Sequence, residues 1–181
     1  MASIAADPDA GPAGGAAAFQ GQLSAAFEAH YRPLVRLASL LLDDVGSSEE
    51  VVQDAFVRVW SRGPGLRDPE RLPAYLRSAV LNGARSQLRR RGVRRRHLRS
   101  VGPGASAAPA EAEALAADPD GAVLRALRAL PDRQREVLAL RYYLDLSEAE
   151  IAATLGISAG SVKTHAHRGL HALAEALEGT R

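Results

Sequence analysis

The segment from 147 to 173, SEAEIAATLGISAGSVKTHAHRGLHAL, carries the signals of a helix-turn-helix. Ser147 can cap a helix, and Glu150 follows at the spacing of a capping box. Gly156 can end that helix, because glycine adopts a left-handed backbone at little cost. Ser158 can then cap a second helix. The inward positions predicted for the two helices are Ile151, Ala152, Leu155, Ile157, Val162, Gly169, Leu170 and Leu173.

The outward face of the second helix is polar and basic. Side chains of this kind donate to phosphates and base edges when a helix-turn-helix enters the major groove. A plain helical hairpin with a solvated polar face is the alternative. The capping box, the placed glycine and the basic face together favour DNA contact. The face consists of Ser161, Lys163, Thr164, His165, His167 and Arg168, with Ser158 at its N-terminal end.

Composition favours an all-α chain without catalytic chemistry. Aromatic residues make up 4% of the chain and cysteine is missing, so the core must be aliphatic and thiolate metal sites are excluded. His167 and His171 could share a helical face, but no carboxylate accompanies them as in H-E-x-x-H. We therefore predict no cofactor, no metal and no enzymatic activity. The sequence has no apolar run of membrane-spanning length.

The chain divides into two helical units. Residues 1–18 have the composition of a disordered tail, and 19–98 form the first unit. Residues 99–120 are a flexible linker, and 121–178 form the second unit, which contains the helix-turn-helix. The fold class is thus all-α, with two small helical domains joined by a linker.

Three helices are expected in the first unit. The first, from 19 to 42, contains Pro33, where we expect a kink or a break. The second runs from 47 to 60 and is capped by Ser47 or Ser48, with Glu50 completing a capping box from Ser47. A loop over 61–72 precedes the third, which ends near residue 91. Trp60 and Tyr75 are expected to be half-buried packing residues, or else stacking platforms for an unpaired base.

Charges are segregated along the first unit. Five acids and no base lie between Asp43 and Asp54, whereas ten arginines and no acid lie between Arg71 and Ala110. The run from Arg85 to Arg99 is either a solvated helix end or a contact to phosphates, and mutual repulsion of the arginines favours phosphates. The segregation predicts separate surfaces for separate partners.

Taken together, these stretches resemble the extracytoplasmic-function group of bacterial sigma factors, promoter-specificity subunits of RNA polymerase. FEAHYRPLVRLASLLLDD (27–44) and SSEEVVQDAFVRVW (47–60) resemble the family's region two. LPAYLRSAVLNGARSQLRRR (72–91) resembles the helix that melts and reads the −10 element. Residues 130–173 resemble region four, which reads the −35 element.

The resemblance implies three surfaces and several partners. The second helix would dock on core polymerase through Glu50, Gln53, Asp54 and Val57, and the third would contact −10 DNA through Arg77, Asn82, Arg85 and Arg89. The helix over 158–168 would read the −35 element, although His165 and His167 stand where relatives often have longer side chains. The implied partners are promoter DNA, the clamp helices and flap of core RNA polymerase, and an anti-sigma factor.

The resemblance implies a cytoplasmic protein, associated with the nucleoid or held at the membrane by an anti-sigma partner, without inserting into the membrane itself. A conventional helix-turn-helix regulator, which binds duplex DNA without polymerase, is the alternative. The two functions differ in whether the chain binds promoter DNA without polymerase.

Overall fold

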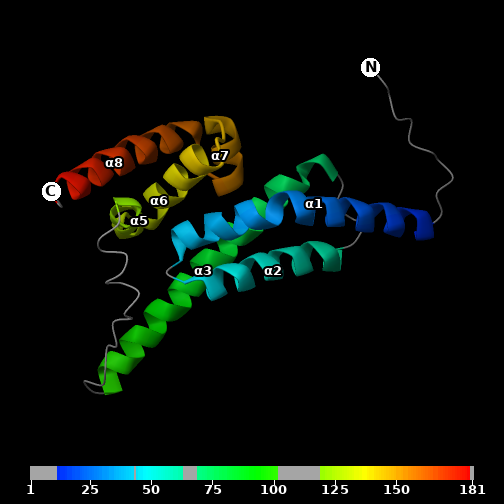
Figure 1. Ribbon diagram of the computed structural model, residues 1–181, viewed down its shortest axis with the longest axis horizontal. Helices are drawn as coiled ribbons and strands as arrows, with labels where there is room; N and C mark the ends of the chain where they lie inside the picture. Colours follow the sequence, from blue (N-terminus) through cyan, green and yellow to red (C-terminus); the bar gives the residue numbers. More distant parts are fainter. Residues whose placement is uncertain (1–11, 43, 63–68, 102–118, 180–181) are drawn as a thin grey trace.

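The structure, a computed structural model, describes residues 12–42, 44–62, 69–101 and 119–179, whose regular elements are all helical. The first unit contains α1 (Pro12–Leu41), α2 (Val45–Arg62), the 3-10 turn η2 (Pro69–Arg71) and α3 (Leu72–Val101). The second contains α5 (Pro119–Ala129), α6 (Asp132–Leu138), the π-helical segment η3 (Ala139–Tyr143), α7 (Glu148–Leu155) and α8 (Ala159–Glu178). Figure 1 shows both units, and the all-α prediction is confirmed.

An aliphatic core holds α1, α2 and α3 together. Each helix contributes apolar side chains at helical spacing, so that one face of each is buried. The most buried of them are Leu37, Ala38 and Leu42 before α2, Val52 and Ala55 on α2, and Leu76, Val80, Leu81 and Ala84 on α3.

Helix α1 departs from the sequence prediction at two places. It begins at Pro12, so residues 12–18 are helical and not part of a disordered tail. The alanines in this stretch have high helix propensity, which the composition argument underrated. The helix also continues through Pro33, so a break there is wrong. Burial of Leu34 and Leu37 just beyond the proline offsets the hydrogen bond lost there. Residues 1–11 of the predicted tail lie outside the described residues.

Asp44 caps α2, which corrects the predicted cap. Its carboxylate accepts from the backbone N–H of Ser47 at 2.6 Å, and its carbonyl accepts from the Ser48 hydroxyl at 2.8 Å. Both serines lie inside the first turn, since α2 begins at Val45. A carboxylate at this position satisfies free N–H groups and favours the positive end of the helix dipole, so it displaces the serines.

Helix α3 is longer than expected. It continues to Val101, well past the predicted end near Arg91, and its C-terminal part extends beyond the other helices (Figure 1). Arg91 fastens this part to the start of α2, because its guanidinium donates to the Asp44 carboxylate and, at 2.6 Å, to the Ser47 hydroxyl. At least one arginine of the basic run therefore has a structural role. Of the predicted loop over 61–72 and the linker over 99–120, residues 63–68 and 102–118 lie outside the described residues.

The helix-turn-helix has the predicted construction. The Ser147 hydroxyl accepts from the Glu150 N–H, and the Glu150 carboxylate accepts from the Ser147 N–H at 2.9 Å. Gly156 has φ 66°, which closes α7 in the left-handed conformation. Ser158 caps α8, whose inward side is Val162, Ala166 and Gly169. Leu170 is 42% exposed, so its predicted inward position is wrong.

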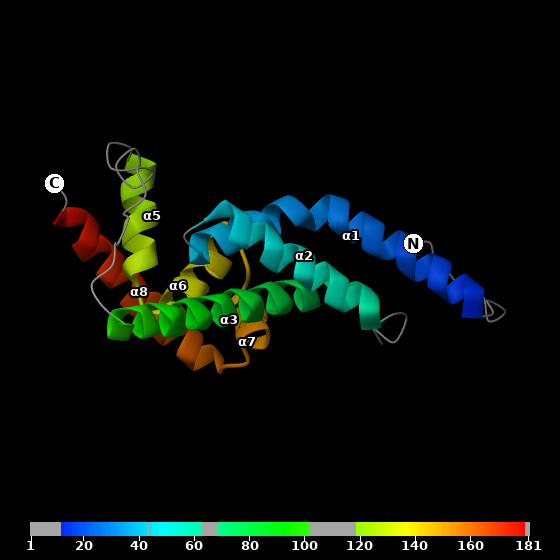
Figure 2. The same cartoon turned by 90° about the horizontal axis from the view of Figure 1, so that it is seen from below.

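The two units pack against each other. Helix α1 contacts α5, α6 and η3, and α3 contacts α7. In the two views, α3 runs alongside the second unit, and its free end extends from the body of the molecule (Figures 1 and 2). Buried side chains of both units form one cluster. The units are therefore in direct contact and do not merely share a tether. None of the described helices combines the length and apolarity needed to cross a membrane.

Candidate nucleic-acid interface

Helix α8 presents the predicted polar face away from the core. Lys163, Thr164, His167 and Arg168 are exposed, and Ser161 and His165 are half-buried. Val162 and Ala166 occupy the opposite side, where they pack into the core. The seven predicted side chains thus lie along one accessible helix, and Ser158 caps its N-terminal end.

Local hydrogen bonds order the N-terminal end of this face. The Ser158 hydroxyl accepts from the Ser161 N–H at 3.1 Å and lies 2.9 Å from the Ser161 hydroxyl. The Thr164 hydroxyl donates to the Gly160 carbonyl at 3.0 Å. These hydroxyls keep lone pairs for further bonds, so they can still meet a DNA backbone or a base edge.

Lys163 forms an ion pair with a residue of the preceding helix. Its ammonium lies 3.7 Å from the carboxylate of Glu148 at the start of α7. The other oxygen of Glu148 accepts from Arg141 at 3.3 Å. The side chains of Lys163 and Glu148 both reach the surface, so their ion pair is weak. Lys163 can therefore exchange Glu148 for a phosphate or a base.

The predicted −10 residues lie on α3, and one of them is held by the second unit. Nε and Nη2 of Arg85 donate to the two carboxylate oxygens of Glu136, at 2.5 and 2.8 Å. The Nη1 atom of Arg85 donates to the side-chain oxygen of Asn82 at 3.1 Å. The Glu136 side chain is only 3% exposed and also accepts from Arg133 at 3.1 Å. The Arg85–Glu136 pair is therefore a bidentate ion pair between the units.

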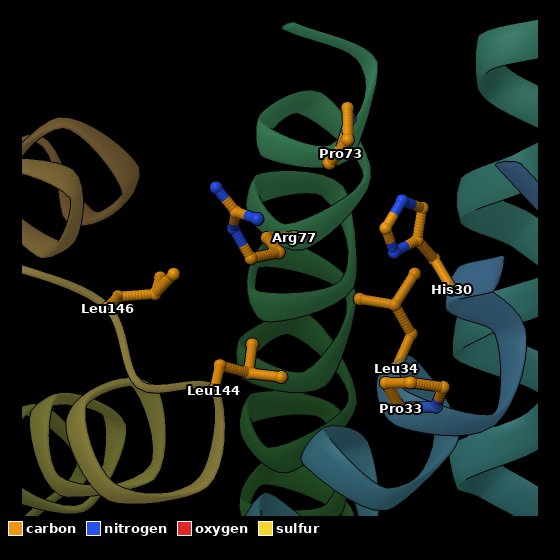
Figure 3. A pocket seen from close by; sticks show the side chains of 7 residues that line it. All are labelled: His30, Pro33, Leu34, Pro73, Arg77, Leu144 and Leu146. Atoms are coloured by element: carbon orange, nitrogen blue, oxygen red, sulfur yellow. The ribbon is translucent and has the colours of Figure 1, made fainter.

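Arg77 also faces the second unit. With six other residues it lines a cavity of about 270 Å³ between α1, α3 and the segment that follows η3 (Figure 3). Burial lowers the pKa of Arg77, and the carboxylate of Glu150 opposes that shift. Among the described residues its buried Nε finds no acceptor. The other residues that line the cavity are His30, Pro33, Leu34, Pro73, Leu144 and Leu146.

Asn82 and Arg89 complete the predicted −10 set, and both are exposed. The four residues thus share α3 but not one environment. Arg77 and Arg85 lie at the boundary between the units, whereas Arg89 faces solvent and lies 3.5 Å from the Ser86 hydroxyl. The second unit therefore covers one side of α3 along the N-terminal and central part of that helix.

A third surface lies on α2. Glu50, Gln53, Asp54 and Val57 are exposed at helical spacing, and Asp54 forms an ion pair with Arg58 of the same helix at 3.8 Å. Val57 is 61% exposed and Trp60, one turn further, is 51% exposed. We call Glu50, Gln53, Asp54 and Val57 the α2 stripe. The stripe is acidic toward its N-terminal end and apolar at Val57, and it lies apart from the boundary between the units.

Sequence reasoning missed one contributor, Glu136, and left the placement of two aromatic rings open. Trp60 and Tyr75 were expected to be half-buried packing residues or else stacking platforms for an unpaired base; both have more than two fifths of their surface exposed, so stacking on them stays a prediction. Glu136 was not singled out, although an acid within the apolar stretch REVLAL is an unusual core residue. That signal predicts burial of Glu136 but not its partner, which lies on another unit.

Known protein families show the same division of the chain into two units. Residues 26–94 match the family described as sigma-70 region 2, and residues 120–173 match the one described as sigma-70, region 4. The chain is 34% identical over 146 residues to an RNA polymerase sigma-E factor of Streptomyces avermitilis, covering 80% of this chain and 79% of that one. It is 33% identical to the ECF RNA polymerase sigma factor SigL of Mycobacterium tuberculosis, covering 88% and 91%.

Two solved structures share the fold. CnrH, in complex with the cytosolic domain of CnrY, matches with a TM-score of 0.67 and 26% identity, over 92% of this chain and 94% of that one. The sigma factor RpoE, in complex with the anti-sigma factor NepR from Bartonella quintana, matches with a TM-score of 0.69 and 22% identity, over 87% and 98%. Both sigma-70 regions are matched, and relatives with 33–34% identity cover at least 79% of each chain. The chain therefore belongs to the extracytoplasmic-function group of the sigma-70 family of RNA polymerase sigma factors.

Proposed function

We propose that this chain works as a non-enzymatic initiation subunit whose three surfaces have separate tasks. The α2 stripe docks on the clamp helices of core RNA polymerase. The exposed and boundary residues of α3 hold the −10 element as it opens. The face of α8 reads the −35 element, while polymerase itself carries out the chemistry in the cytoplasm.

The observation that carries the proposal is the α2 stripe. Glu50, Gln53, Asp54 and Val57 are all exposed on one helix. Val57 and Trp60 lie one turn apart and are both more than half exposed beside these acids. Adjoining exposed apolar side chains with a polar rim mark protein-interaction sites, whereas a single one would not. A regulator that binds duplex DNA alone has no need of such a stripe, so the observation favours the sigma function over that alternative.

Tethering explains how two modest DNA-binding units can act together. Each unit on its own offers a small face, but fixing both to one polymerase makes the second contact intramolecular. Phosphate contacts from the α3 arginines would add affinity that depends on salt. An anti-sigma partner, as NepR is for the solved RpoE, is a further proposed binder of this chain.

Run-off transcription with purified core polymerase on a library of genomic promoter fragments tests the proposal. Transcripts with defined starts should need both the chain and the core enzyme. The Lys163→Ala/Arg168→Ala variant provides the matched control for promoter recognition. Duplex binding by the chain alone, with no polymerase-dependent transcripts, would support the conventional regulator instead.

A further inference from the structure

The Arg85–Glu136 pair joins a proposed DNA-binding residue to the other unit of the same chain. We propose that this pair is an internal latch, in which the Glu136 carboxylate occupies the place of a DNA acceptor and keeps the −10 face of α3 closed until the units separate. The inference rests on the proposed function and adds its regulation.

The geometry of the guanidinium supports the latch. Nε and Nη2 form one edge of the fork, and both donate to Glu136. Nη1 donates to Asn82, which is itself a proposed DNA contact. An arginine recognises a phosphate or a guanine best through such a two-donor edge. Glu136 therefore uses the same donors that DNA would need.

Burial makes the contact exclusive. Glu136 is 2% exposed as a residue, and it lies on α6, which brings its carboxylate against Arg85 of α3. No DNA strand could reach the Nε–Nη2 edge of Arg85 while α6 remains there. Release of the edge thus requires movement of the second unit, not only rotation of a side chain.

Other contacts close the same boundary. The Ser78 hydroxyl donates to the Thr154 carbonyl of α7 at 3.3 Å. Arg128 of α5 donates to the Ser39 carbonyl of α1 at 2.9 Å. Arg77 lies beside the cavity between the units and feels the charge of Glu150. Two of the proposed −10 residues, Arg77 and Arg85, are therefore covered at once.

The latch is built to open. Desolvation offsets much of the attraction in a buried ion pair, so such a pair holds two units together less firmly than its short distances suggest. After separation, Glu136 keeps Arg133 as a partner and gains water, while Arg85 gains DNA. The α2 stripe stays exposed in the closed form, so docking on polymerase can precede opening.

Distance measurements on the free full-length chain test the latch. The chain has no cysteine, so Arg58→Cys on α2 and His171→Cys on α8 introduce two unique sites for spin labels. Electron–electron resonance then reports the distance distribution between the units. The doubly labelled chain without further substitutions should give a single narrow peak at a short distance between the labels. Glu136→Gln should raise the fraction of longer distances at least about tenfold, because removing one partner of a buried pair leaves the other charge without compensation.

Glu148→Gln is the matched control. Glu148 is also a carboxylate of the second unit with two cationic partners, but both partners belong to that unit. Its substitution should leave the distances unchanged. Arg85→Gln should open the chain as Glu136→Gln does, and the double variant should open it no further, because both changes remove one interaction.

Two results would overturn the latch: a wild-type distribution that is already broad, or Glu136→Gln distances equal to wild type with unchanged circular dichroism. If Glu136→Gln fails to fold, Arg85→Gln, on the half-exposed side of the pair, decides the question. These measurements need no polymerase. Failure of run-off transcription by the wild type would therefore count against the proposed function and leave the latch to be judged separately.

Discussion

Gly83 of α3 lies directly against Val51 of α2. A Cβ placed on Gly83 would come within 2.8 Å of a Val51 methyl carbon, closer than real contacts of this kind. The valine is 6% exposed and has little room to move. The glycine therefore sets how closely α2 and α3 approach, and with them the distance between the proposed polymerase-docking and −10 surfaces.

We expect Gly83→Ala to destabilise the first unit by about 1–3 kcal/mol, the usual effect of overpacking, in spite of alanine's higher helix propensity. Urea unfolding followed by circular dichroism measures the change. Gly92→Ala is the control on the same helix, because a Cβ there meets nothing within 4 Å. That variant should be stabilised by up to about 1 kcal/mol. A Gly83→Ala chain as stable as wild type would show that α2 and α3 are less tightly packed.

The Asp44 cap should make stability depend on pH. The hydrogen bond from the Ser47 N–H lowers the pKa of Asp44 on folding, and Arg91 adds to the effect. A lowered folded-state pKa means that the stabilisation is complete above the unfolded-state pKa of about 3.9 and disappears as pH falls through the lower folded-state value. Asp44→Ala should cost about 1 kcal/mol at pH 7.

The difference between wild type and Asp44→Ala should narrow below pH 4, as measured by thermal unfolding across pH. Asp44→Asn keeps an oxygen acceptor for the cap but cannot titrate, so it should retain most of the stability and lose this part of the pH dependence. An equal gap between wild type and Asp44→Ala at pH 7 and pH 2.5 would rule out the charged cap.

The turn of the helix-turn-helix depends on one backbone conformation. Gly156 has φ 66°, and no atom crowds a Cβ there, so strain and not space decides the effect of substitution. Gly156→Ala should destabilise the second unit by about 1–2 kcal/mol. Gly156→Asn should cost clearly less, since asparagine tolerates this conformation. Thermal unfolding compares the three chains, and equal losses for Ala and Asn would point to a cause other than φ.

Local signals made the helix-turn-helix predictable. The capping box of Ser147 and Glu150 and the glycine at 156 each act within a few residues, so the sequence contains the whole argument for them. The cap of α2 shows the limit of this reasoning, because Asp44 and two serines compete for one position. Only the actual start of the helix at Val45 decides among them.

Contacts between distant segments could not be predicted in the same way. Arg85 and Glu136 are separated by 51 positions, and the periodicity of neither helix names a partner on another helix. The length of α3 was underestimated because its arginines were read as charges that repel each other. Arginine is also a good helix former, and Arg91 is neutralised by Asp44.

The α2 stripe should fail to bind polymerase after charge reversal. Asp54 has 63% of its side chain exposed, and its pair with Arg58 is a weak surface pair. Asp54→Arg should therefore abolish co-purification with core polymerase and leave circular dichroism unchanged. Glu175→Arg is the control, with the same charge change on an exposed residue of α8. Retention of Asp54→Arg at the wild-type level would count against this docking face.

The final prediction concerns Lys163 and Arg168, the two full positive charges on the proposed reading face of α8. Five residues separate them, so they point in different directions on the helix. Lys163→Ala should cost about 1–3 kcal/mol and relax specificity at one −35 position, whereas Arg168→Ala should weaken binding to all sequences and lower the salt slope by about one. Glu148→Gln removes the surface partner of Lys163 and should strengthen binding slightly. Holoenzyme titrations on single-base −35 variants at several salt concentrations separate these effects. If Lys163→Ala weakens every variant equally, Lys163 contacts phosphate, and the reading of bases must fall to Ser161, Thr164 and His165.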